Sequence, residues 1–180
     1  MKSLLHTALS FLLCIVLWGC PYESFYAIDI SPQQNIDEGL IGKWAAFVPR
    51  PSLENEYTES PVKIIFEKRN DMEYDVAITG YIDELKKYRV IENDTIKGTA
   101  FISVIDSRQF LNTFIKGKYY IAEIKRQDST FSLLTLAEKF TSKFVKNSEG
   151  LRNAISVHYK TKPEPVYDDW FVAKNLQKVN

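Results

Sequence analysis

Few residues of this chain have side chains suited to nucleophilic, acid–base or metal chemistry. Its 180 residues include only two cysteines and two histidines. A catalytic triad or a zinc site needs several such side chains in a recognisable arrangement. His158 lies beside an apolar stripe, which is more typical of a packed or surface residue than of a catalyst. We therefore predict no catalytic residues, no metal site and no cofactor, and we expect that the protein is not an enzyme.

Clusters of acidic residues are the remaining candidates for chemistry. Asp168 and Asp169 are adjacent, and Glu54, Glu56 and Glu59 crowd one stretch of the chain. Paired carboxylates can bind calcium or act as acid and base on sugars. Neither group has an ordered ligand spacing, so we interpret both as solvated charge.

The N-terminus has the pattern of a secretion signal. Lys2 precedes an apolar run over residues 8–18, and the small Gly19 follows that run. A positive start, an apolar stretch of about 7–15 residues and a small residue at the cut define a secretory signal peptide. A membrane-spanning helix is the alternative, but it needs about 20 apolar residues, and polar residues interrupt this stretch. We predict that residues 1–19 are a signal peptide.

The residues around the expected cleavage site are more specific. Leu17 stands three positions before Cys20, and Gly19 stands directly before it. This pattern resembles the lipobox of bacterial lipoproteins, from which Trp18 departs because a small residue is usual there. The resemblance implies that Cys20 is the lipid attachment site, carries acyl chains such as palmitate, and anchors the protein to a membrane. A secreted protein without lipid is the alternative.

Cleavage and lipidation at Cys20 would determine where the protein is located in the cell and where the mature chain begins. No acidic run follows Cys20, of the kind that resembles a surface-export signal in some bacterial lipoproteins. We therefore expect a protein of the bacterial cell envelope, anchored in the outer membrane and facing the periplasm. Residues 20–38 show no sustained periodicity and are predicted to be a flexible tether. The 23 Lys plus Arg balance the 23 Asp plus Glu, so we expect no nucleic-acid partner.

From residue 39 onward the chain has the pattern of short antiparallel strands. Val62, Ile64 and Phe66 alternate with polar residues, and Tyr74 and Val76 do the same after a turn. Such alternation turns one face of each strand toward a core. Further strands are expected over residues 95–105, 110–115, 119–125 and 130–135. Many short strands at near-even spacing predict a mainly β domain, either a barrel or a sandwich.

The period changes after these strands. Leu136, Phe140 and Phe144 recur every fourth residue, which predicts an amphipathic helix over residues 136–147. The apolar stripe of a second expected helix consists of Leu151, Ile155 and Tyr159. We therefore predict two C-terminal helices before a closing strand that begins near Trp170.

A short motif connects the strand pattern with a family. Gly42 and Trp44 form a G-x-W pattern at the start of the first strand of this domain. The motif resembles the signature of lipocalins and related calycins, in which the Trp plugs the closed end of a barrel. The resemblance implies an antiparallel barrel over residues 39–180, and it implies that Lys174 stacks on Trp44. The strand count is consistent with about eight to nine strands, closed or flattened into a sandwich.

The aromatic content leaves two functions open. Phe, Trp and Tyr make up 13% of the chain, more than its motifs explain. Inward rings either line a pocket for a small apolar or amphipathic ligand or simply fill the core. In the first case the protein binds such a ligand. In the second it is an envelope adaptor that binds another protein without a ligand cavity, and an exposed apolar patch would favour that function.

Overall fold

The structure is a computed structural model that describes residues 22–50, 58–80, 95–137, 140–141, 144–161 and 167–179. The expected signal peptide and Cys20 lie outside the described residues. The strands are β1 (Glu23–Ser24), β2 (Gly42–Arg50), β3 (Thr58–Lys68), β4 (Tyr74–Gly80), β5 (Thr95–Ile105), β6 (Arg108–Ile115), β7 (Lys118–Gln127), β8 (Thr130–Leu136) and β9 (Tyr167–Val179). The helices are the short 3-10 helix η1 (Glu38–Leu40) and α3 (Ser148–Thr161).

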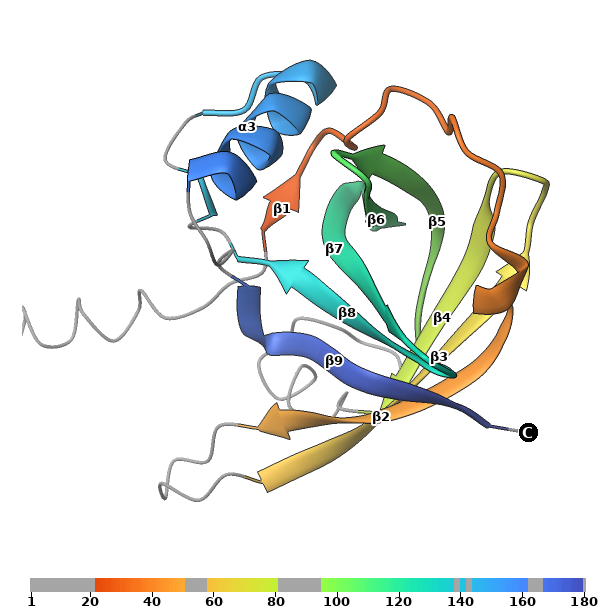
Figure 1. Cartoon of the computed structure of the whole chain (residues 1–180). Coiled ribbons are helices and arrows are strands. Elements are labelled where there is room, and N and C mark those ends of the chain that lie inside the picture. The colour runs from red at the N-terminus through yellow and green to blue at the C-terminus, as the bar shows by residue number, and fades with distance from the viewer. Residues whose placement is uncertain are drawn as a thin grey trace, which may run out of the picture.

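Strands β2 to β9 form one closed antiparallel barrel (Figure 1). Each strand pairs with the next along the chain, and β9 pairs with β2 to complete the circle. The alternation that predicted β3 and β4 is realised, because Val62, Ile64 and Phe66 are buried inside the barrel. The expectation of a mainly β antiparallel barrel is confirmed, and closure leaves these strands without a free edge over their paired residues.

Tight turns connect neighbouring strands at alternate ends of the barrel. Asp106 and Ser107 join β5 to β6 with φ values of 47° and 67°. Lys116 and Gly117 join β6 to β7 with φ values of 48° and 83°. Positive φ at both central residues is the conformation whose twist matches that of a β-hairpin. These turns therefore fix the register of the middle strands.

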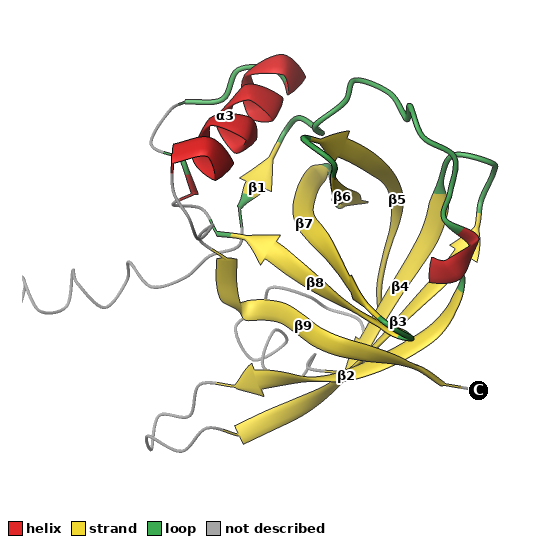
Figure 2. Cartoon of the chain, in the orientation of Figure 1, coloured by secondary structure: helices red, strands yellow, loops and turns green. Residues whose placement is uncertain are grey.

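The prediction of two C-terminal helices is wrong, since α3 is the single α-helix of the described residues (Figure 2). Strand β8 continues to Leu136, and the described residues near Phe140 are not α-helical. Leu136 and Phe140 are buried, but Phe144 is 86% exposed. The spacing of four therefore does not mark one helix face: Leu136 ends a strand, Phe140 is buried after it, and Phe144 is exposed.

Helix α3 lies outside the barrel, near β1 (Figure 1). Its predicted stripe is largely as expected: Leu151 and Ile155 are buried, and Tyr159 is partly buried against the same cluster. They pack on outward-facing side chains of the barrel such as Phe110 and Ile121. We call this layer between the helix, the N-terminal segment and the barrel the outer-wall layer.

Candidate functional site

Aromatic rings close one end of the barrel interior. Trp44 and Phe131 meet edge to face with their ring centroids 4.6 Å apart. Phe66 lies 6.3 Å from Phe131 and 5.7 Å from Tyr74. Leu40, from η1, is fully buried in the same cluster and accepts a 2.7 Å hydrogen bond from Trp44 Nε1 on its carbonyl oxygen. We call these four rings the aromatic plug.

Trp44 of the G-x-W motif belongs to this plug, and Gly42 lies two residues before it at the start of β2. Gly42 has a φ of 129°, and a Cβ at this position would lie 2.8 Å from Cε of Lys178. Nζ of Lys178 lies 5.6 Å from the centroid of the Trp44 ring, at a distance suited to a cation–π contact. The cation over the ring is therefore Lys178, and the predicted residue, Lys174, is exposed elsewhere on β9.

The register of β9 explains this difference. Trp44 pairs directly with Lys178 across the β2–β9 ladder. Asn175 has a φ of 52°, which interrupts simple alternation between residues 174 and 178. A residue with positive φ changes which face the following side chains occupy. The sequence pattern alone does not reveal this irregularity, so it does not show which lysine of the last strand faces Trp44.

Beyond the plug, the interior is lined by smaller side chains. The buried interior cluster includes alanines from four strands, namely Ala46, Ala100, Ala122 and Ala173. The remaining members outside the plug are valines, isoleucines and leucines. Within the described part of the buried interior cluster, the rings are thus gathered at the plug and the remaining members are aliphatic.

Polar groups lie at the end of the barrel opposite the plug. Ala100 pairs with Thr113, Thr113 with Tyr120, and Tyr120 with Glu23 of β1. Directly opposed residues of an antiparallel pair point to the same face, so these side chains continue the inner face from Ala100. The Tyr120 hydroxyl donates a 2.9 Å hydrogen bond to Oε1 of Glu23. Burial raises the pKa of Tyr120, and the Glu23 carboxylate raises it further, so the phenol remains a hydrogen-bond donor.

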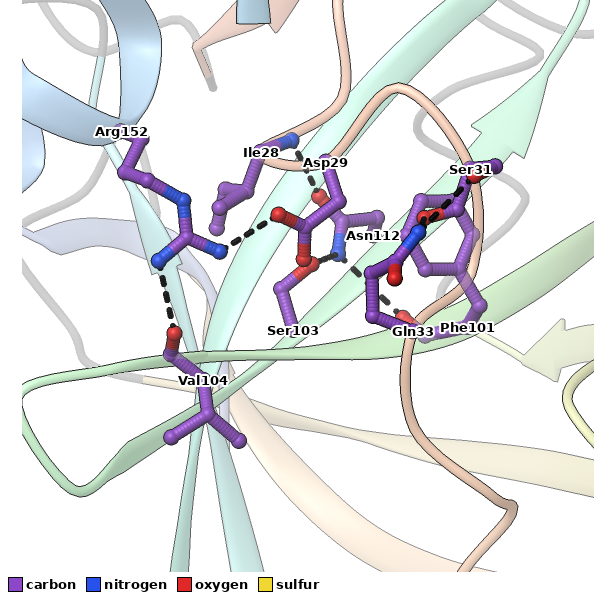
Figure 3. Close-up of polar contacts among 9 residues, drawn as sticks. All are labelled: Ile28, Asp29, Ser31, Gln33, Phe101, Ser103, Val104, Asn112 and Arg152. Carbon is purple, nitrogen blue, oxygen red and sulfur yellow. Dashed lines mark hydrogen bonds and ion pairs between the residues drawn. The ribbon is translucent and has the colours of Figure 1, made fainter. Parts of the chain in front are cut away.

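The N-terminal segment is held against the outside of the barrel (Figure 3). The Ile28 amide donates a 2.8 Å hydrogen bond to Oδ1 of Asn112, which is fully buried on β6. Nδ2 of Asn112 donates to the Ser103 hydroxyl at 2.9 Å. Arg152 of α3 donates to the Val104 carbonyl at 2.8 Å and to the Asp29 carboxylate at 2.5 Å. Within the stretch predicted as a flexible tether, residues 22–29 are thus held against the barrel and α3.

The far end of this segment contacts the plug. The Ile36 amide donates to the carbonyl of Asp71 at 2.8 Å. The Asp37 carboxylate pairs with Arg126, and the Asp37 amide donates to the Tyr74 hydroxyl at 2.5 Å. Burial raises the pKa of Tyr74 to about 12. Residues 22–41 therefore run from the side of the barrel to its plugged end, as Figure 1 shows.

A buried carboxylate lies in the outer-wall layer. Glu123 accepts hydrogen bonds from Tyr159 at 2.7 Å, from Tyr167 and, at 2.9 Å, from Arg108. The Arg108 guanidinium also lies 4.3 Å from the centre of the Tyr159 ring. Burial is the main cause that raises the pKa of both tyrosines, with the Glu123 carboxylate adding to it. The neutral phenols therefore serve as donors that hold α3 and the start of β9 on β7. No sequence motif marked this group.

His158 is packed in the same layer. It is 5% exposed, and its ring lies edge-on to Phe140 at a centroid distance of 6.3 Å. Its Nε2 has no hydrogen-bond partner. The described residues contain no group of three His, Cys, Asp or Glu side chains that could hold a metal ion. Glu54 and Glu56 lie outside the described residues, as do the side chains of Glu59, Asp168 and Asp169.

The fold defines the class of the protein as a closed antiparallel eight-stranded barrel with one outside strand and an outer helix. Comparisons with protein-family models, with curated proteins and with solved structures find no match to this chain. Within the described part of the chain, no helix has the length and apolarity needed to cross a membrane.

Proposed function

We propose that this protein is a lipid-anchored bacterial envelope protein whose barrel binds a small apolar or amphipathic ligand. The anchor rests on the sequence pattern that ends at Cys20. The ligand is supported by one observation: among the described residues, the rings of the interior cluster gather in the plug, and its other members are aliphatic and include four alanines. An eight-stranded barrel has an interior just wide enough to be filled by side chains or to hold one small ligand.

The four alanines carry the argument for a ligand. Ala46, Ala100, Ala122 and Ala173 come from β2, β5, β7 and β9, so small side chains occur around the circumference of the barrel. An alanine contributes fewer atoms to the interior than the leucines and rings near the plug. The Tyr120–Glu23 pair at the end opposite the plug adds polar groups suited to the head of an amphipathic molecule.

Filling the interior tests the ligand. Ala122→Leu should lower uptake of a fluorescent fatty acid by about tenfold or more, because the added atoms occupy the ligand's space. Ala77→Leu is the matched control, since Ala77 lies on the other face of β4 from the buried Val76. Native mass spectrometry of the wild-type chain should show a co-purified small molecule. Finding neither bound mass nor fatty-acid uptake contradicts ligand binding.

Metabolic labelling tests the anchor. Radiolabelled palmitate should enter the wild-type chain and be lost in Cys20→Ala. Cys14→Ala is the control and should keep the label, because Cys14 precedes the expected cleavage site. If the label persists in Cys20→Ala, the lipid is not attached at Cys20 and the proposed anchor site is wrong.

A further inference from the structure

The start of the described chain is fixed on the barrel close to the proposed anchor. The Tyr22 amide donates a 2.8 Å hydrogen bond to the carbonyl of Leu136, and Tyr22 packs edge-on against Phe140 at 4.6 Å. Glu23 and Ser24 then pair with β7. Cys20 precedes Tyr22 by two residues, which span at most about 7 Å of extended chain. A lipid on Cys20 would therefore hold this side of the barrel close to the bilayer.

Exposed aromatic and basic side chains gather on this side. Phe25 is 71% exposed, and Tyr26 beside it is also exposed. Nζ of Lys118 lies 3.3 Å from the centroid of the Phe25 ring. Phe114 is exposed on β6, four residues before Lys118, and Lys116 is exposed in the turn between them. We call these five residues the rim patch.

We propose that the rim patch lies against a lipid bilayer and sets the orientation of the barrel on the membrane; this rests on the proposed lipid anchor. Aromatic side chains concentrate at membrane interfaces, where their rings reach the headgroup level. Lysines beside them are attracted to anionic lipids. Phe25 and Tyr26 follow β1 within six residues of Cys20, and the other three residues of the rim patch lie on the β6–β7 hairpin that β1 borders.

This orientation has a consequence for the ligand. The β6–β7 turn, which carries Lys116, lies at the end of the barrel opposite the aromatic plug, because successive turns of an antiparallel barrel alternate between its ends. Tyr120 and Glu23 continue the inner face toward that same end. The end opposite the plug is thus turned toward the bilayer, and an amphipathic ligand would exchange with the membrane and not with the bulk solvent.

A single fluorescent probe tests the orientation on the lipidated full chain. The mature chain has no cysteine other than Cys20, so Phe25→Cys offers one free thiol for an environment-sensitive nitrobenzoxadiazole label. Met72→Cys is the matched control, because Met72 is 40% exposed in the β3–β4 connection at the plugged end. In vesicles of phosphatidylcholine and phosphatidylglycerol in equal parts, the probe at 25 should brighten, shift to the blue and be quenched by spin-labelled lipid. The probe at 72 should do none of these.

Flotation of the same vesicles separates the possible failures. If the chain floats with the vesicles but the two probes behave alike, the anchor stands and the rim-patch proposal is overturned. If the chain does not float at all, the anchor fails and the rim patch fails with it. Lys116→Glu combined with Lys118→Glu should weaken the quenching at position 25, whereas Lys43→Glu combined with Lys63→Glu should leave it unchanged. Equal loss in both double variants would also overturn the proposal.

Discussion

The barrel interior and the outer-wall layer are stabilised by different interactions. The interior cluster is composed of apolar and aromatic side chains from β2 to β9, with Leu40 closing one end. The outer-wall layer contains apolar residues as well, but it also buries Asn112, Glu123 and His158. Apolar burial is non-directional and depends on filled volume. Buried polar groups stabilise only when each has a partner in the right geometry.

The two regions therefore have different roles: the interior mainly stabilises the fold, and the outer-wall layer positions the N-terminal segment and α3. The interior cluster has more buried apolar residues than the outer-wall cluster, so we expect it to contribute more hydrophobic stabilisation. The outer-wall hydrogen bonds decide where the N-terminal segment and α3 lie. The chain beside the proposed anchor is therefore placed by a few specific contacts, and we expect that it can be loosened without unfolding the barrel.

The largest expected effect comes from the interior. Phe131→Ala should lower the free energy of unfolding by about 3–5 kcal/mol, because it removes a fully buried ring and leaves a cavity beside Trp44 and Phe66. Phe47→Ala, at an exposed position, should change it by less than about 0.5 kcal/mol. Urea unfolding measures both. Equal losses in the two variants would contradict the assignment of Phe131 to the core.

A smaller but more local effect is expected in the outer wall. Asn112→Ala should cost about 1–3 kcal/mol, because the Ile28 amide and the Ser103 hydroxyl lose their partner. Hydrogen exchange should show faster exchange at the Ile28 amide while the strands of the barrel remain protected. Gln33→Ala is the control, since its exposed side chain bonds to nearby Ser31. Uniformly faster exchange across the barrel would remove the distinction between the two layers.

Alkaline titration tests the interior through Tyr74 of the aromatic plug. Burial raises the pKa of Tyr74 from 10.0 to about 12. Between these values the unfolded chain has lost the phenol proton that the folded chain keeps, so stability falls as pH rises from 10 to 12. The loss from Tyr74 should approach about 2 kcal/mol at pH 12. Urea unfolding of Tyr74→Phe should show a shallower decline than that of the wild type; identical slopes would contradict the role of Tyr74.

The smallest expected effect concerns the cation over the plug. Lys178→Ala should lower the free energy of unfolding by about 0.5–1 kcal/mol through loss of the contact with the Trp44 ring. Lys174→Ala should have less effect, since Lys174 is exposed away from Trp44. Thermal unfolding of the two variants gives the comparison. A larger loss for Lys174→Ala would restore the assignment suggested by the family resemblance.

Local patterns predicted the elements that repeat regularly. Alternation located β3 and β4, and the stripe of Leu151 and Ile155 located α3. Alternation is reliable here because one face of each strand must be buried. The helix expected over residues 136–147 failed because a spacing of four carries no information on whether Leu136 already belongs to a strand.

The site residues show the same division. The sequence drew attention to Gly42 and Trp44, because a short motif lies within one strand and needs no knowledge of distant pairing. It did not identify Lys178, Asn112 or Glu123, whose partners lie on other elements: Ile28 is 84 positions from Asn112, and Tyr167 is 44 positions from Glu123. Such contacts depend on strand register and on the packing of α3.

Sequence and tertiary structure therefore establish different properties of this protein. Composition and strand alternation are sufficient for a mainly β domain, because burial of one strand face is a local requirement. Closure of the barrel, the identity of the cation over Trp44 and the attachment of residues 22–29 were decided by the tertiary structure alone. Each depends on which distant backbone groups come within hydrogen-bonding distance, and that is set by the pairing of the whole sheet.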